Sequence, residues 1–317
     1  MGNFFKSLLF GEAEESAEDK AKRDFEMFKY DGIRALQMGK TAYAVRCFQE
    51  ALKIREETET LEYLIKVYTN TEQLDEAIGA ADRLMALAPD NSETLLLRAH
   101  LYFLAERYPE AVADCEQAIA IRSDDPQAHY LLGKIQHTSG DGLSAAVSLS
   151  QAIALKEDFV AAHLLRAEVL YRAKDYKEGL ADVEKVIAWV PEEENAYLCR
   201  GQLHEALGNS ELAENDYSYV KELNPFNEEV YLRLGKLFMT REQPENAIEL
   251  LDEAIELKPD FARAYSERGR ARLMLGDQKG SFEDMKKAIE LNPEGEEARK
   301  LEGKFSNFEE MYSNRVL

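Results

Sequence analysis

Small side chains return along this chain at a fixed interval of 34 residues. After Gly32, the row reads Ala99, Gly133, Ala167, Gly201, Gly235, Gly269 and Gly303. Only Ile65 interrupts it, and Ile65 also marks a first unit that is one residue shorter than the others. A period of this length predicts an array of stacked supersecondary units rather than a single globular core.

A second row of small residues follows twelve positions after the first. Its members are Ala44, Ala77, Ala111, Ala145, Gly179, Ala213, Ala247 and Ser281. Two such rows predict two helices in close contact within each unit. Proline recurs where the second helix should end, at Pro89, Pro191, Pro225, Pro259 and Pro293, and it is absent at Glu56, Ser123 and Glu157. Glycine recurs between the helices, at Gly39, Gly140, Gly208 and Gly276, where a left-handed turn is expected.

These rows resemble the tetratricopeptide repeat family, whose 34-residue unit carries small residues at positions 8, 20 and 27 and proline at 32. The resemblance covers residues 25–304 and implies an all-α, right-handed α-solenoid superhelix of eight helical hairpins. We expect three segments: residues 1–24 as an apolar decapeptide and charged lead-in, residues 25–294 as the repeats, and residues 295–317 as a capping helix and tail. Leu301, Phe305, Phe308 and Tyr312 would form the apolar face of the capping helix.

The net charge of the chain excludes some classes of binding partner. The chain carries 39 Lys and Arg against 61 Asp and Glu, a formal charge of −22, so nucleic acid and anionic membranes would be repelled. Cys47, Cys115 and Cys199 show no metal-binding or disulfide spacing, which fits a reducing, cytoplasmic location. No stretch approaches the length of a membrane span. We therefore expect protein or peptide partners.

The resemblance implies that first helices line a concave groove, chiefly through positions 2, 5, 9, 12 and 13 of each unit. Position 9 is biased to cations, and its members are Ile33, Lys66, His100, Lys134, Glu168, Gln202, Lys236 and Arg270, with Lys304 beyond the repeats. One interpretation is a basic track that attracts an acidic peptide or a terminal carboxylate. The other is that these cations pair with acidic neighbours and only solubilise the surface.

Aromatic residues join the cations near the middle of the chain. The predicted central patch consists of His100, Phe103, Tyr130, Lys134, His137, Tyr171 and Arg172, and Lys66, Lys236 and Arg270 extend the predicted groove. Aromatic side chains exposed in a concavity commonly anchor interfaces. The alternative is that Phe103 and Tyr171 pack against neighbouring helices.

One subclass of the family clamps the carboxylate at the end of chaperone tails with a set of Lys, Asn and Arg residues. Lys29 occupies the first place, but Ile33, Tyr63, Glu93 and Leu97 stand where the other clamp residues belong. A co-chaperone of that kind is therefore not expected, although another peptide could use the same groove.

Other chemistry is not indicated. His129, His163 and His204 fall at positions that normally hold core aromatics, and His100 and His137 have no third ligand in register for a metal. Arg98, Arg166, Arg200 and Arg268 share position 7, a regularity that favours helix-to-helix pairing over ligand binding. No catalytic or phosphate-binding motif is present, so we expect neither an enzyme, nor a metal, nor a cofactor.

The apolar face of Phe4, Phe5, Leu8 and Leu9 requires a partner of its own. It could cover the first hairpin, dock in a groove or touch a membrane. The leading hypothesis for the chain is a non-catalytic scaffold that binds a peptide or helix of a partner protein. The alternatives are a structural protein that self-associates through this N-terminal face, and a co-chaperone without the usual clamp.

Overall fold

The computed structural model describes residues 16–295, and these residues form sixteen α-helices and no strand. The chain divides into two compact units, Met1–Ala162 and His163–Leu317, with one helix crossing the division. The helices are α2 (Ala17–Gln37), α3 (Thr41–Ile54), α4 (Thr58–Asn70), α5 (Leu74–Leu87), α6 (Ser92–Leu104), α7 (Tyr108–Ile121), α8 (Pro126–Thr138), α9 (Gly142–Leu155), α10 (Val160–Arg172), α11 (Tyr176–Trp189), α12 (Glu194–Ala206), α13 (Ser210–Leu223), α14 (Glu228–Thr240), α15 (Pro244–Leu257), α16 (Ala262–Met274) and α17 (Gln278–Leu291).

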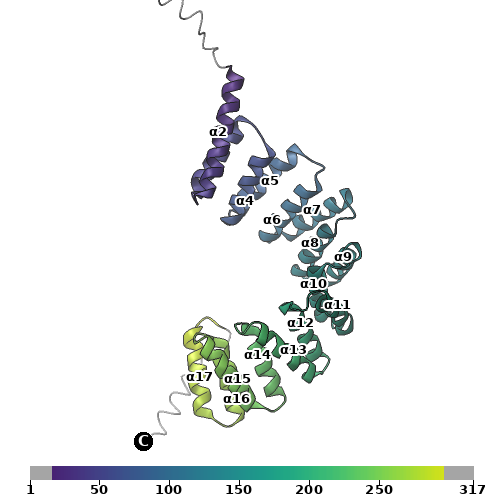
Figure 1. Ribbon diagram of the computed structural model, residues 1–317, viewed down its shortest axis with the longest axis vertical. Helices are drawn as coiled ribbons and strands as arrows, with labels where there is room; N and C mark the ends of the chain where they lie inside the picture. Colours follow the sequence, from purple (N-terminus) through teal and green to yellow (C-terminus); the bar gives the residue numbers. More distant parts are fainter. Residues whose placement is uncertain (1–15, 296–317) are drawn as a thin grey trace, which may run out of the picture. The chain divides into compact units, whose positions relative to one another are not determined.

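Consecutive helices form eight antiparallel hairpins, from α2/α3 to α16/α17 (Figure 1). Within each unit a hairpin also contacts the next one, as α7 does α8 and α15 does α16. The predicted fold class, an all-α solenoid of about eight helical hairpins, is confirmed. The predicted capping helix lies outside the described residues. Helix α2 begins at Ala17, so the first helix is longer than its counterparts and runs through the expected boundary at residue 24.

The turn inside every hairpin uses one left-handed residue. The four predicted glycines adopt it, with φ from 70° at Gly39 to 93° at Gly140. The equivalent residue in the other four hairpins is not glycine: Glu72, Glu106, Lys174 and Glu242 have φ between 57° and 64°. A hydrogen bond closes the turn in both cases, as when the Lys40 N–H donates to the Ala35 carbonyl. The chain geometry thus dictates this conformation even where the residue type does not favour it.

The second helices end at the same place in the repeat with or without proline. After α3, α7 and α9, where proline is missing, the helix still ends at the residue before Arg55, Arg122 or Lys156. The short first unit has a simple origin. Only residues 55–57 connect α3 to α4, and the Glu57 side chain caps α4 by accepting from the Thr60 N–H at 2.9 Å.

Each hairpin is held at close range by one pair of positions 16 residues apart, at 8 and 24 of the repeat. A Cβ added to Gly201 would lie 2.4 Å from the Tyr217 ring, and one added to Gly133 would lie 2.7 Å from Leu149. The sizes at the two positions complement each other. Glycine faces a large residue in Gly32–Phe48, Gly133–Leu149, Gly201–Tyr217, Gly235–Leu251 and Gly269–Met285, whereas the other hairpins have Ala99–Cys115, Ala167–Val183 and Ile65–Ala81.

This complementarity explains the one break in the row of small residues. Ile65 and Ala81 are both buried in the same apolar cluster, at 3% and 0% exposure. The large residue has moved from the second helix to the first, so the total volume between the helices is kept.

We expect Gly201→Ala to destabilise the α12/α13 hairpin by about 1–3 kcal/mol, because the added methyl overlaps the buried Tyr217 ring. Hydrogen exchange of the α12 and α13 amides measures this loss. Gly79→Ala is the matched control: nothing lies within 4 Å of its added Cβ, so higher helix propensity should stabilise α5 by up to about 1 kcal/mol. Equal effects of the two substitutions would contradict the role given to the contact.

A second pair, at positions 7 and 23 and also 16 residues apart, is ionic in half of the hairpins. Arg98–Asp114, Arg166–Asp182, Arg200–Asp216 and Arg268–Asp284 each join the two helices through two guanidinium nitrogens, and all four aspartates are buried. The predicted pairing role of these arginines is confirmed. Where the first helix carries leucine instead, the facing residue is uncharged: Leu64–Ala80, Leu132–Ser148 and Leu234–Leu250.

Asp182 is the most buried of these four aspartates. It accepts from Arg166 at 2.6 Å and lies 2.8 Å from Nδ1 of the fully buried His163. Burial alone raises the pKa of Asp182, but hydrogen bonds with Arg166 and His163 lower it by more, and the net pKa lies below its ordinary value of 3.8. His163 also packs edge-on against Trp189, so this predicted core histidine has a packing role.

Arg200→Leu should destabilise α12/α13 by roughly 3 kcal/mol, because it leaves the Asp216 carboxylate buried without its guanidinium partner. Adding Asp216→Leu reproduces the Leu234–Leu250 pair of another hairpin and should recover most of that loss. Chemical denaturation of the two variants and the parent compares them. A double variant no more stable than the single one would show that the pair is not an exchangeable unit.

Because the pKa of Asp182 is lower in the folded state, its stabilising contribution is complete above about pH 4 and is lost as the pH falls through the folded value. Asp182→Asn should therefore lower Tm at neutral pH, and the gap from the parent should close toward pH 2. Leu250→Ala, at the equivalent but uncharged position, should lower Tm by an amount that does not vary with pH. A gap that is constant with pH for both variants would rule out the ionic contribution.

Candidate protein-binding surface

The first helices of neighbouring hairpins contact each other directly, as α6 does α8 and α14 does α16. Position 8 of each faces its own hairpin, where Ala99 and Gly133 are buried. The following residue, at position 9, points away from that contact: His100 is exposed and Lys134 is partly exposed. The chain therefore presents position 9 on a wall formed by consecutive first helices.

Side-chain caps fix where these two helices begin. The Asn91 side chain accepts from the N–H of Glu93 at 2.8 Å and starts α6. Asp125 accepts from the N–H of Gln127 at 2.9 Å and starts α8, with Pro126 at the first helical position. Both helices thus hold their position-9 and position-12 side chains at the same level of the repeat.

Five of the predicted residues share this wall in the first unit, and we call them the α6–α8 surface: His100, Phe103, Tyr130, Lys134 and His137. Lys134 of α8 reaches across to α6, where its ammonium lies 5.2 Å from the centre of the Phe103 ring. The rings of His100 and Phe103 stack at 6.4 Å. The structure therefore brings three of the five together as one cation–aromatic group.

Lys134 places a cation beside His100 on the α6–α8 surface. Burial and the nearby Lys134 charge both lower the pKa of His100, so His100 is neutral at pH 7. Burial raises the pKa of Tyr130, whose phenol stays protonated. Within the described part of the first unit, no carboxylate lies within 4.0 Å of the Lys134 ammonium.

The aromatic residues of the α6–α8 surface, Phe103 and Tyr130, pack against neighbouring side chains and are partly exposed. Phe103 is partly buried against the apolar cluster that contains Cys115 and Ile135, and its ring lies 6.2 Å from Tyr108. Tyr130 packs against Phe159 at 5.0 Å. The packing alternative therefore applies to Phe103, and both Phe103 and Tyr130 remain partly exposed.

The two remaining members of the predicted patch, Tyr171 and Arg172, belong to the second unit. Tyr171 packs against Tyr176 with ring centres 5.7 Å apart. Arg172 makes an ion pair with Glu168, one turn earlier, at 2.8 Å. Both of these contacts lie within α10 and α11.

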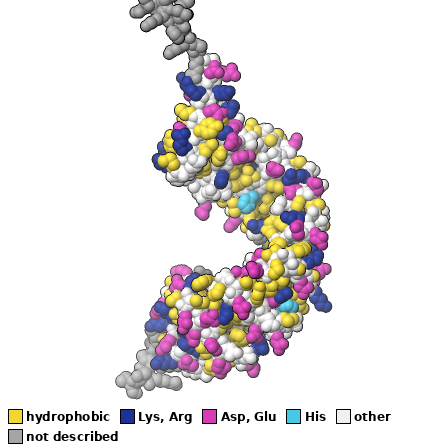
Figure 2. All heavy atoms as spheres, in the orientation of Figure 1, with side chains coloured by type: hydrophobic (Ala, Val, Ile, Leu, Met, Phe, Trp, Pro, Cys, Tyr) yellow, Lys and Arg dark blue, Asp and Glu magenta, His cyan; other side chains and the backbone are white. Residues whose placement is uncertain are grey.

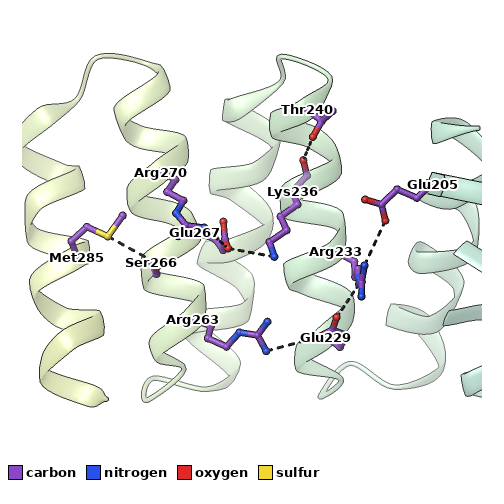
Figure 3. A network of polar contacts seen from close by, with 10 residues as sticks. All are labelled: Glu205, Glu229, Arg233, Lys236, Thr240, Arg263, Ser266, Glu267, Arg270 and Met285. Carbon is purple, nitrogen blue, oxygen red and sulfur yellow. Dashed lines mark hydrogen bonds and ion pairs between the residues drawn. The ribbon is translucent and has the colours of Figure 1, made fainter. Parts of the chain in front are cut away.

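Cations at position 9 of the last two hairpins share one carboxylate. Glu267 is buried, and its carboxylate lies 2.9 Å from Arg270 and 3.8 Å from Lys236 (Figure 3). Next to them, Glu229 bridges Arg233 and Arg263 in the same wall. Pairing with acidic neighbours therefore applies to this end of the predicted basic track.

Glu267 was not among the residues predicted from the sequence. Its position within the first helix, three residues before Arg270, was a usable signal because side chains at that spacing are neighbours on a helix. Lys66 differs from Lys236. It is exposed, and no described carboxylate lies within 4.0 Å of its ammonium.

Lys29 is not free to act in a carboxylate clamp. Its ammonium is buried and lies 2.7 Å from Glu57 and 2.5 Å from Glu59. Burial lowers the pKa of Lys29, but the hydrogen bonds to both carboxylates raise it by more, so the cation is locked in place. This contact supports the expectation that the chaperone-tail clamp is missing.

Charges of both signs are spread over the visible surface, with hydrophobic side chains between them (Figure 2). Two clefts of about 270 Å³ and 440 Å³ lie in the second unit, and none of the predicted site residues lines either one. Within the described chain, no three His, Cys, Asp or Glu side chains are grouped as metal ligands. None of the described helices has the length and apolar character of a membrane span.

Known repeat families match two stretches of the chain. A model described as TPR repeat matches residues 99–140 and 235–276, and two tetratricopeptide repeat models match residues 130–190 and 262–294. A search of curated protein sequences finds no match.

Solved structures share the fold at low sequence identity. A tetratricopeptide repeat protein from Parabacteroides merdae is 17% identical with a TM-score of 0.61, covering 84% of this chain and 99% of that one. PilW, described as a type IV pilus biogenesis factor, is 19% identical with a TM-score of 0.58, covering 66% and 97%. A chain of the Cut9–Hcn1 assembly of the APC/C is 12% identical with a TM-score of 0.56, and the match covers 91% of this chain and 59% of that one. At these identities the likeness is one of fold.

Proposed function

Because the chain belongs to the tetratricopeptide repeat family, we propose that it is a non-catalytic scaffold that binds an acidic, extended segment of a partner protein on the first-helix wall of its first unit. The observation that carries the proposal is the α6–α8 surface. There Lys134, with no carboxylate within 4.0 Å among the described residues of the first unit, lies over an aromatic ring in a chain of net charge −22.

Two cations of the first unit supply the attraction. Lys66 on α4 and Lys134 on α8 have no described carboxylate of the first unit within 4.0 Å, whereas Lys236 and Arg270 already share Glu267. A partner carboxylate would bind most favourably at these two lysines, because it would not have to displace a carboxylate of the chain itself. The neutral His100 can donate or accept a hydrogen bond beside them.

Phe103 and Tyr130 supply the apolar contact. Each already packs against neighbouring side chains, so binding orders little that is not already ordered. Aromatic anchors of this kind carry a large share of interface energy. The preferred ligand is therefore a segment that alternates Asp or Glu with an aliphatic or aromatic side chain.

A peptide array of acidic sequences with single aromatic residues, probed with the full chain, identifies a ligand for fluorescence anisotropy. Lys66→Glu with Lys134→Glu should weaken its binding by at least about tenfold and flatten the dependence on salt. Lys177→Glu with Lys279→Glu is the matched control, since it makes the same charge change at two exposed lysines outside the wall. Equal weakening by both pairs would mean that only net charge matters, and unchanged binding by the first pair would refute the proposed surface.

A further inference from the structure

Helix α9 stands apart from the other fifteen helices of residues 16–295 because it contains no Asp, Glu, Lys or Arg. Charges begin again at its two ends, with Asp141 just before it and Lys156 just after it. In a chain with 32% charged residues, an uncharged helix would normally be enclosed on all sides. Only one side of α9 is enclosed.

The enclosed side packs in the usual way through Ala145, Leu149 and Ala152, each 0% exposed. The opposite side carries Leu143 at 84% and Val147 at 71% exposure. Among the large hydrophobic side chains described, Leu143 is the most exposed and only Phe226 is comparable with Val147. Large apolar side chains this exposed indicate an interaction site.

The exposed side chains form a seam. Leu143, Val147, Ser150 and Ala154 are all exposed and follow one another at spacings of four, three and four residues. This is the spacing by which one helix packs along another. The Ser150 hydroxyl already donates to the Ala146 carbonyl at 2.7 Å, so it can be covered without losing a hydrogen bond.

We propose that the occupant of this seam is the same helix of a second copy of the chain, packed antiparallel about a two-fold axis. The axis would pass between residues 148 and 149. It sets Leu143 against Ala154 of the second copy and Val147 against Ser150, so a large residue meets a small one in every layer.

The same axis sets Asp141 opposite Lys156 of the second copy at both ends of the seam. Both residues are exposed, and the antiparallel arrangement also opposes the two helix dipoles. Glu157 and Asp158 follow Lys156 along the chain and lie in a turn, which is closed by a hydrogen bond from the Phe159 N–H to the Lys156 carbonyl. Two molecules of net charge −22 repel each other over most of their surface, and an uncharged face is where that repulsion is least.

Sedimentation equilibrium of the full chain tests the proposal. One helix from each copy buries less than a standard interface, so we expect a monomer–dimer equilibrium with a Kd on the order of 10 μM. Val147→Glu should raise this Kd by at least about tenfold with unchanged far-UV circular dichroism, because the side chain is exposed in the monomer. Phe226→Glu, at a similarly exposed apolar position in a loop, should leave the Kd unchanged.

A charge exchange tests the antiparallel register. Lys156→Glu should weaken the dimer by opposing two carboxylates, and adding Asp141→Asn, which retains a capping side chain, should restore part of the affinity. Deletion of residues 1–11 should leave the Kd unchanged. A chain that is monomeric at concentrations about tenfold above the expected Kd, a Val147→Glu dimer of normal affinity, or loss of the dimer on deleting residues 1–11 would each overturn the proposal.

Discussion

Close approach of two helices within each hairpin is the constraint on which the molecule depends. It needs a small residue opposite a large one, as in Gly201 and Tyr217, because a Cβ at the first position would overlap the ring. The stacking of hairpins, the wall of first helices and the exposure of position 9 all follow from that contact. Since each hairpin contacts mainly its neighbours, stability is close to a sum of local terms, and a change in one hairpin is felt mostly there.

Sequence periodicity was sufficient to predict the helices, the turns and the pairing role of the position-7 arginines. It predicted the left-handed turn only where glycine marks it, because Glu72 and Lys174 carry no such mark and take the conformation under the demands of the hairpin. It also left Ile65 unexplained. The explanation is the small residue Ala81 on the second helix, which makes room for Ile65 on the first. Reading each row of positions separately does not reveal that the side-chain volumes in two rows compensate each other.

The candidate surface was harder to predict than the fold. The position-9 cations look equivalent in sequence, yet Lys134 lies over an aromatic ring while Lys236 shares a buried carboxylate with Arg270. Glu267 on the next first helix supplies a carboxylate for Lys236, whereas no described carboxylate of the first unit lies within 4.0 Å of the Lys134 ammonium. Whether a position-9 cation is free to bind a ligand thus depends on the side chains that neighbouring hairpins place beside it. The residue types along position 9 alone do not give that information.

Residues that match each other within one hairpin affect how such arrays can lengthen by duplication. Ile65 and Ala81, or Arg200 and Asp216, are copied together whenever one hairpin is duplicated, so the new module arrives already matched. Arg98 and Arg268 are exceptions, since each also binds an aspartate of the preceding hairpin, Asp82 and Asp252. Those two ion pairs favour a fixed order of hairpins, and shuffling the array would break them.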